Sequence, residues 1–201
     1  MTNNPQFQRP AFKIRGRKSP LALTIGILVI IGALFTALSG FYADWLWFKS
    51  VDFTSTWSTI LGTKVLLFVV TGLLTSSIVV ANVWIAYKRR PLYVPMTVEA
   101  DNLERYRSQV EPIRRTLFIG GFVALFYFAG TSGSTLWSSW LLFKNSTDFG
   151  VKDPQFNMDI SFFAFRLPFW QTLIGWGIST LVLAVIASVA VHYLYGGIRL
   201  Q

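Results

Sequence analysis

The chain has 201 residues, of which 53% are hydrophobic and only 13% charged, about half the charged fraction of soluble domains, so the composition argues against a soluble protein. The net charge of +9 would suit a nucleic-acid-binding protein, but the basic residues lie between long apolar runs, and nucleic acid is therefore not an expected partner. Cysteine is absent, which excludes disulfides, thiolate metal ligands and a thiol nucleophile.

The first 20 residues are polar, basic and rich enough in proline to predict a disordered cytoplasmic tail. Arg9, Lys13, Arg15, Arg17 and Lys18 occur there without an acidic residue. This basic cluster either acts only as a topology signal or also contacts anionic lipid head groups.

Four apolar runs are long enough to cross a hydrocarbon core of about 30 Å, which requires about 20 helical residues. They cover residues 21–42, 57–87, 116–137 and 169–195. The runs lack period-2 alternation, so helices rather than barrel strands are predicted. The first run is longer than a signal-peptide core and is interpreted as a retained span. The predicted fold class is an all-α membrane protein, a four-transmembrane-helix bundle of two helical hairpins.

Charge predicts the orientation of these spans. Thirteen of the eighteen Lys and Arg residues belong to the tail, to the loop 88–115 or to the end 196–201. Since positively charged loops stay inside, both termini and that loop are predicted to be cytoplasmic, in a bacterial plasma membrane. Residues 43–56 and 138–168 are then the outer loops.

The inner loop contains a short helical pattern. Leu103, Tyr106 and Val110 recur at helical spacing, which predicts an amphipathic helix that Glu111-Pro112 ends. This segment is either a solvated connector or a helix on the membrane surface or a partner protein.

Small residues recur four apart within the spans, a spacing that lets helices approach closely. The pairs are Gly72 and Ser76, Gly120 and Ala124, Gly175 and Ser179, and Ala184 and Ser188. The third run ends in "AGTSGSTLWSSW", residues 129–140, which either lines a polar cavity or is buried with its hydroxyls bonded to carbonyls one turn back. Burial is the favoured interpretation.

Ionisable residues inside the spans are few, although such residues would be functional candidates. Lys64 lies near a span end and can extend outward. His192 is the single histidine, so neither a histidine metal cluster nor a Ser-His-Asp triad can form from this chain. We predict no catalytic, cofactor-binding or metal-binding residues and no cofactor, and the protein is not predicted to be an enzyme.

The second outer loop carries five oxygen-bearing side chains, Asn145, Asp148, Asp153, Asn157 and Asp159. They could hold calcium, but their spacing fits no known calcium loop and these residue types are common turn formers. An aromatic belt follows, at Phe162, Phe163, Phe165, Phe169 and Trp170. Pro168 is expected to begin the last helix.

Three motifs carry a resemblance to a known family: "FYADWLWFKSV", "NLERYR" and "DPQFNMDISFFAFRLPF". The sequence resembles the uncharacterised bacterial membrane protein family numbered 0182, found mainly in actinobacteria and cyanobacteria. The resemblance runs from Phe41 to the C-terminal "HYLYGGIRLQ". It implies a multi-pass plasma-membrane protein of several hundred residues with a large extracytoplasmic region, of which this chain is expected to be an N-terminal portion. The family brings no established reaction or catalytic residue.

The stretch "WLWFK" at residues 45–49 returns as "WLLFK" at residues 140–144, each time followed by Asp-Phe. Both copies follow an odd-numbered span and fall at the predicted outer face, where Trp and Lys anchor at head groups. Either one interface pattern was used twice, or a two-helix hairpin was duplicated.

Three functions remain in consideration. The favoured one is a structural or assembly module of the cell envelope, whose outer loops bind a membrane-protein or envelope partner, or another part of the same protein. A transporter or channel subunit would use the Ser/Thr/Gly run of the third span as its route. An enzyme ranks last because it would need Asp148, Asp153 or Asp159 without a nucleophile–base pair.

Overall fold

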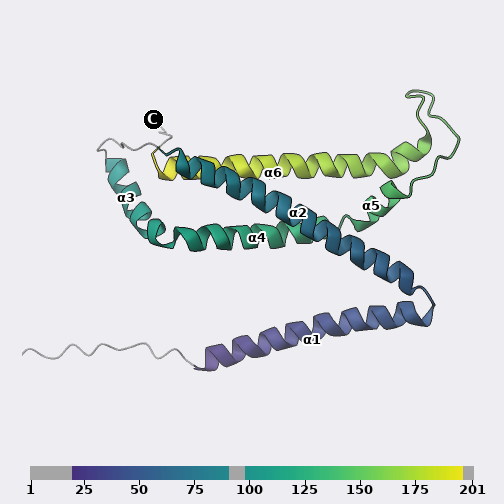
Figure 1. Ribbon diagram of the computed structural model, residues 1–201, viewed down its shortest axis with the longest axis horizontal. Coiled ribbons are helices and arrows are strands. Elements are labelled where there is room, and N and C mark those ends of the chain that lie inside the picture. Colours follow the sequence, from purple (N-terminus) through teal and green to yellow (C-terminus); the bar gives the residue numbers. More distant parts are fainter. Residues whose placement is uncertain (1–19, 91–97, 197–201) are drawn as a thin grey trace, which may run out of the picture. The chain divides into compact units, whose positions relative to one another are not determined.

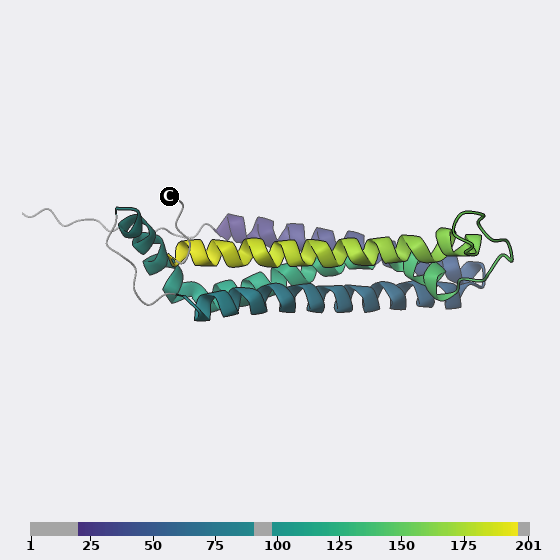
Figure 2. The ribbon, with the colours of Figure 1, turned by 90° about the horizontal axis from the view of Figure 1, so that it is seen from above.

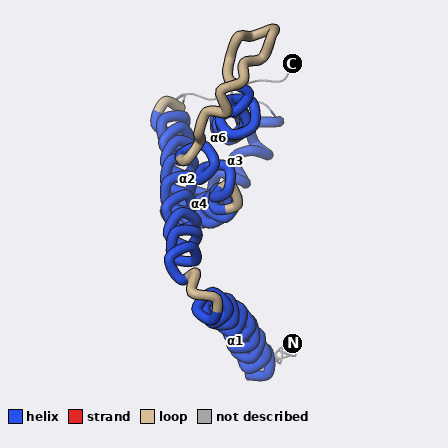
Figure 3. Tube along the Cα trace, turned by 90° about the vertical axis from the view of Figure 1, so that its right-hand side faces the viewer, coloured by secondary structure: helices blue, strands red, loops and turns tan. Residues whose placement is uncertain are grey.

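The computed structural model describes residues 20–90 and 98–196, and these ranges contain helices, turns and one isolated bridge but no β-strand (Figure 3). The helices are α1 (Pro20–Ser50), α2 (Thr54–Lys88), α3 (Val98–Val110), the 3₁₀ turn η1 (Glu111–Ile113), α4 (Arg114–Ser134), α5 (Trp137–Lys144), the π-helical turn η2 (Phe162–Arg166) and α6 (Leu167–Leu194) (Figure 1). Four segments are long and apolar enough to cross a membrane: Leu23–Ser50, Thr54–Lys88, Glu104–Ser134 and Phe162–Leu194. The predicted all-helical class with four long apolar helices is confirmed.

The chain divides into two compact units, residues 1–54 and 55–201. In the first, α1 is a single helix with mostly exposed apolar side chains. It ends with the first copy of the repeated motif, where the Lys49 ammonium lies 4.9 Å from the Trp45 ring centroid. Asp52 then adopts a φ of 57°, and the Phe53 N–H donates to the Phe48 carbonyl at 2.9 Å. A residue in this left-handed conformation is a common way to end a helix.

In the second unit, α2 packs against both α4 and α6. Phe68 and Tyr87 of α2 contact Phe126 and Phe118 of α4, so these helices run antiparallel. Towards α6, Thr75 contacts Thr180 and Tyr87 contacts Tyr195, so α2 and α6 run parallel. α2 crosses the other two helices obliquely in Figure 1, and all three extend between the same two ends in Figure 2.

Glycines set the close approach of α2 and α4. A Cβ on Gly72 would lie 2.7 Å from the Phe126 carbonyl oxygen, and one on Gly130 would lie 2.8 Å from the Phe68 carbonyl oxygen. A Cβ on Gly133 would collide with the Thr71 side chain. Residues without a side chain therefore allow backbone-to-backbone contact here, as is typical of helices that pack in membranes.

The predicted small-residue pairs have mixed outcomes. Gly72 and Ser76 lie buried at the α2–α4 contact, and Ala184 is buried on α6. At Gly120 and Gly175 an added Cβ would meet nothing within 4 Å, so these glycines do not pack against another described helix, and their pairing stays a prediction. Spacing alone does not reveal which helix face meets a neighbour.

Buried hydroxyls add polar contacts between the helices. Thr71 Oγ1 donates to the carbonyl of Leu67 in its own helix at 2.7 Å and also lies 3.1 Å from the Ala129 carbonyl oxygen of α4. Thr75 Oγ1 accepts from Trp176 Nε1 of α6 at 3.1 Å. Such interhelical hydrogen bonds in membrane proteins contribute about 0.6–2 kcal/mol each.

The Ser/Thr/Gly run at the end of α4 is only partly buried. Its glycines, Gly130 and Gly133, face α2, whereas Thr131 and Thr135 are exposed. The hydroxyls of Thr131 and Thr135 donate to carbonyls of Tyr127 and Ser132 in their own helix. The predicted burial was therefore right for the glycines and wrong for these threonines, because the contact with α2 covers one face of α4.

Several helix ends differ from the predicted spans. α1 continues to Ser50, past the predicted end at 42, while α4 ends at Ser134 and α5 lies inside the predicted outer loop. Hydropathy alone does not locate such helix ends, because Trp, Lys and Ser occur both in the interfacial turns of helices and in loops. The predicted tail, residues 1–20, and the predicted C-terminal end, residues 196–201, lie outside the described residues except for Pro20 and Gly196.

The helix predicted in the inner loop is present as α3, and it ends at Glu111-Pro112 as predicted, where η1 separates it from α4. Pro112 occupies the first turn of η1, which leads directly into α4. Proline is tolerated at this position because its missing N–H would have no helical partner there. Pro168 acts similarly at the start of α6, where the Leu167 N–H donates five residues back to the Phe162 carbonyl.

Candidate functional site

The charged side chains of the second unit gather towards its two ends. The basic end comprises residues 87–90, residues 104–115 and the last turn of α6 with Tyr195. The loop end comprises residues 137–166, whose loop extends beyond the helices in Figure 3.

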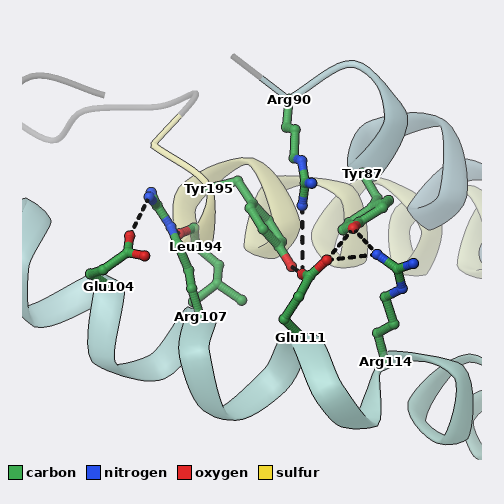
Figure 4. Close-up of polar contacts among 8 residues, drawn as sticks. All are labelled: Tyr87, Arg90, Glu104, Arg107, Glu111, Arg114, Leu194 and Tyr195. Carbon is green, nitrogen blue, oxygen red and sulfur yellow. Dashed lines mark hydrogen bonds and ion pairs between the residues drawn. The ribbon is translucent and has the colours of Figure 1, made fainter. Parts of the chain in front are cut away.

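At the basic end, the Glu111 carboxylate joins three helices (Figure 4). Its Oε1 accepts from the Tyr87 hydroxyl of α2 at 2.7 Å and from Arg114 Nη1 of α4 at 2.6 Å. Its Oε2 accepts from the Tyr195 hydroxyl after α6 at 3.0 Å and lies 3.6 Å from Arg90 Nη1. One carboxylate thus meets two hydroxyls and two guanidinium groups.

Aromatic rings complete this cluster. The guanidinium carbon of Arg90 lies 4.3 Å from the ring centroid of Tyr87 and 5.0 Å from that of Tyr195. The two rings meet edge to face at 5.3 Å. A guanidinium over a ring contributes about 0.5–2 kcal/mol, so Arg90 is held by both its ion pair and the rings.

Arg107 of α3 contacts the end of α6. Its Nε donates to the Leu194 carbonyl at 2.7 Å, and its Nη1 pairs with Glu104 at 3.2 Å. A cation at a helix C-terminus satisfies a free carbonyl and the helix dipole. The side chain is only 13% exposed, and its Nη2 is buried without a hydrogen-bond partner in the described structure.

An apolar groove of about 260 Å³ opens beside this cluster, between α2, α4 and α6. Its walls are aliphatic and aromatic, including Val79, Val83, Leu117, Leu125 and Val191. The polar residues in its lining are Tyr87, Arg114 and Tyr195, which belong to the basic end. The groove is therefore apolar along its length and basic at one end.

At the loop end, two aspartates organise the backbone. Asp153 Oδ2 accepts from the N–H groups of Gln155 and Phe156 at 3.0 and 2.7 Å. The turn closes with Asn157 at a φ of 51°, a conformation that asparagine tolerates. This is the turn-forming role that the sequence predicted for these residue types.

Asp159 holds the base of the same loop. Its carboxylate accepts from the N–H groups of Phe149, Gly150 and Ser161 at 3.0, 2.8 and 2.8 Å. Hydrogen bonds from the side chain and the backbone N–H of Ser161, joined by the N–H groups of Phe149 and Gly150, lower the pKa of Asp159 to about 2. Donors that favour the charged form have this effect on a carboxyl group.

Arg166 and stacked rings connect the loop to the helices. Arg166 Nε donates to the Ser146 hydroxyl at 3.0 Å, and its Nη2 lies 3.5 Å from Asp148 Oδ1. Phe143 of the second repeated motif stacks on Phe169 of α6, with ring centroids 4.5 Å apart. Arg166 therefore fixes the start of the loop, and the Phe143–Phe169 stack fixes α5 against α6.

The loop presents apolar side chains outward. Phe149, Val151, Phe156, Met158 and Ile160 are all exposed, and Phe156 is 60% exposed. Phe149 and Phe156 also contact Phe165 and Phe163, at centroid distances of 5.4 and 5.9 Å. These five exposed residues are called the apolar tip below.

The structure does not gather the five predicted oxygen-bearing residues around one point. Asn145 Nδ2 donates to the Leu141 carbonyl, Asp148 faces Arg166, and the remaining three build the turns described above. Among the residues that the structure describes, no group of three or more His, Cys, Asp or Glu residues is placed to hold a metal. The turn-forming interpretation is therefore the one that the geometry supports.

The Glu111 cluster was missed at the sequence level. The signal was present in "NLERYRSQVEPIRR", where an acidic residue next to proline stands among arginines at a predicted span end. Its partners Tyr87 and Tyr195 lie 24 and 84 residues away. Only the antiparallel arrangement of α4 with the other two helices brings them together.

Comparisons with family models and with curated proteins identify the same family. Residues 21–201 match the family described as Uncharacterised protein family (UPF0182). The chain is 42% identical to a UPF0182 protein of Streptomyces coelicolor over 191 residues and 46% identical to one of Salinispora arenicola over 195 residues. These alignments cover 95% and 96% of the chain but 19% of each relative, so the chain spans about a fifth of the length of these curated relatives. No solved structure matches the chain.

Proposed function

Because the chain belongs to the uncharacterised protein family UPF0182, we propose that it is a membrane-embedded assembly module of the bacterial cell envelope, which binds its partner through the loop end. It crosses the plasma membrane four times, with both termini and the basic end in the cytoplasm. The partner is an envelope protein or a further part of the longer proteins that the relatives represent.

Membrane insertion is supported by the exposed surface of the helices. Large apolar side chains are exposed along α1, α4 and α6, including Phe35, Phe128 and Ile186 at 71%, 71% and 60%. Patches of this extent mark surfaces that contact lipid or protein. The basic end and the loop end then lie on opposite sides of the bilayer, as the positive-inside rule requires.

The observation that carries the assembly function is the apolar tip on an ordered loop. Asp153 and Asp159 hold the loop backbone, and Arg166 bonds the Ser146 side chain, so the exposed rings of the loop keep their positions before any partner arrives. Preorganisation of this kind reduces the entropy lost on binding. Aromatic and methionine side chains are also the types enriched in protein interfaces.

Transport and catalysis receive less support from the described residues. Phe68 and Thr71 of α2 pack directly against the glycines of the third span and leave no space beside them. The groove lies at the basic end and is not lined by Thr131 to Thr135. Asp153 and Asp159 use their carboxylates on backbone N–H groups. Neither arrangement offers a polar route or a nucleophile–base pair.

Photo-crosslinking tests the proposal. With p-benzoylphenylalanine at position 156 in native membranes, we expect a crosslinked protein product, and we expect that product to weaken when Val151→Ser and Met158→Ser are added. Position 128 is the matched control, because Phe128 is an equally bulky exposed ring in the middle of α4. The same product from both positions, or none from position 156, would overturn the assembly function, as would purification of the chain alone as a monomer from mild detergent.

A further inference from the structure

The groove at the basic end has the form of a site for one flexible apolar chain. It extends along α2 from Tyr87 to Val79, a distance of about 12 Å at 1.5 Å per helical residue. Its far part is lined by aliphatic side chains alone, with no polar group to orient a compact polar ligand. An added Cβ on Gly121, which lines the groove, would meet nothing within 4 Å.

The open end of the groove carries positive charge in excess. Residues 88–90 and 98–115 contain seven basic and four acidic residues, and two of the acidic residues, Glu104 and Glu111, pair with arginines. Arg114 lines the groove and is about half exposed. Arg107 lies at the same end outside the lining of the groove, where its Nε donates to the Leu194 carbonyl.

An aliphatic groove that ends at an arginine complements a lipid with an anionic head group. Arginine binds phosphate through paired N–H donors, and basic pockets between transmembrane helices on the cytoplasmic side suit anionic head groups. The chemistry at the two ends of the groove therefore matches the two parts of a single phospholipid.

We propose that this groove binds an anionic phospholipid of the inner leaflet, with one acyl chain between α2, α4 and α6 and the phosphate at Arg114 (Figure 4). The inference rests on the membrane insertion proposed above. The lipid would connect the ends of all three helices, beside the Glu111 cluster.

Two neighbouring glycines provide a matched test. Gly121→Leu places a side chain in the groove, whereas Gly120→Leu adds the same side chain one residue away, where an added Cβ also meets nothing and which does not line the groove. Phosphatidylglycerol and phosphatidylcholine binding to the detergent-solubilised chain is measured by native mass spectrometry. We expect phosphatidylglycerol to bind at least fivefold more tightly than phosphatidylcholine. Gly121→Leu should weaken phosphatidylglycerol binding about tenfold, and Gly120→Leu should leave it unchanged.

The head-group contact has its own variant and its own contrary results. Arg114→Gln should weaken phosphatidylglycerol binding more than phosphatidylcholine binding, whereas the loss of a merely structural contact would weaken both equally. Equal binding of the two lipids, equal effects of the two glycine variants, or displacement of phosphatidylglycerol by glycerol phosphate alone would overturn the proposal. If the groove instead accommodates a further helix, the two lipids should bind equally. Lipid binding is measured in detergent, whereas membrane insertion is tested by the cysteine labelling described in the Discussion. A failure of the lipid proposal can therefore be told apart from a failure of the proposed membrane insertion.

Discussion

At the scale of single residues, two carboxylates organise the two ends of the second unit in different ways. Asp159 accepts three backbone N–H groups and fixes a loop. Glu111 accepts side-chain donors from α2, α4 and the residue after α6, and fixes the ends of helices. Hydrogen bonds to charged groups contribute about 1.5–3 kcal/mol where they are shielded from water, and less at exposed sites such as these.

Acidification should release the loop at a defined pH. The pKa of Asp159 is lowered from 3.8 to about 2 in the folded loop, so its contribution to loop stability is complete above about pH 4 and is lost as the pH falls through about 2. Nuclear magnetic resonance of the Gly150 amide in micelles should show a constant shift down to about pH 4 and a transition centred near 2. The Asp159→Asn variant should lack this transition, and a midpoint near the ordinary value of 3.8 would contradict the prediction.

At the scale of elements, α2 is the helix on which the second unit depends. One of its faces carries Thr71, Gly72, Thr75, Ser76 and Val79, all buried, while the neighbouring leucines Leu73 and Leu74 are exposed. This reverses the pattern of a soluble helix, in which the apolar face is buried. In lipid, close packing and hydrogen bonding hold helices together, so small and hydroxyl-bearing residues occupy the contact.

Adding a methyl group at a glycine of the α2–α4 contact should force these two helices apart. Gly130→Ala places its Cβ 2.8 Å from the Phe68 carbonyl oxygen, and overpacking of this kind costs about 1–3 kcal/mol, which corresponds to a loss of about 3–10 °C in apparent Tm. Gly120→Ala is the control in the same helix, where an added Cβ meets nothing within 4 Å. That variant should retain or slightly raise Tm because alanine favours helix by up to about 1 kcal/mol. Equal thermal unfolding of the two variants in detergent would refute the packing described here.

At the scale of the whole molecule, the second unit has ends of opposite character. One end is basic and polar, with the Glu111 cluster and the groove, and the other is a hydrogen-bonded loop with an apolar tip. The helices between them are covered by exposed apolar side chains. The membrane insertion proposed above would suit all three regions, with the apolar helices in the bilayer and the two ends on either side of it.

Cysteine labelling can establish the orientation directly, since the chain contains no cysteine of its own. We expect Gln155→Cys to react with a membrane-impermeant maleimide in intact cells. Ser108→Cys should react only after permeabilisation, because the proposed orientation places α3 on the cytoplasmic side. Both positions are exposed, so burial does not account for a difference, and the reverse pattern would place the termini outside.

Prediction from sequence succeeded where the signal is local. The all-helical class and the four apolar helices follow from run length and hydropathy, which depend on consecutive residues. The helix α3 followed from three apolar residues at helical spacing. The helix ends, α5 and the π-helical turn were missed, because interfacial residues such as Trp140 and Ser138 have no clear preference between helix and loop. The proposed duplication of hairpins stays a prediction, since each unit is described alone.

The chain's composition was enough to identify a helical protein suited to a bilayer, because about 20 consecutive apolar residues satisfy their own backbone only as a helix in lipid. The sequence did not show that Gly130 packs against α2 while Gly120 does not, or that Glu111 accepts hydrogen bonds from Tyr87 and Tyr195. Those outcomes depend on which faces of α2, α4 and α6 lie together. Packing, side-chain hydrogen bonds and grooves arise between residues far apart in the chain, so they exist only once the helices have been placed against one another.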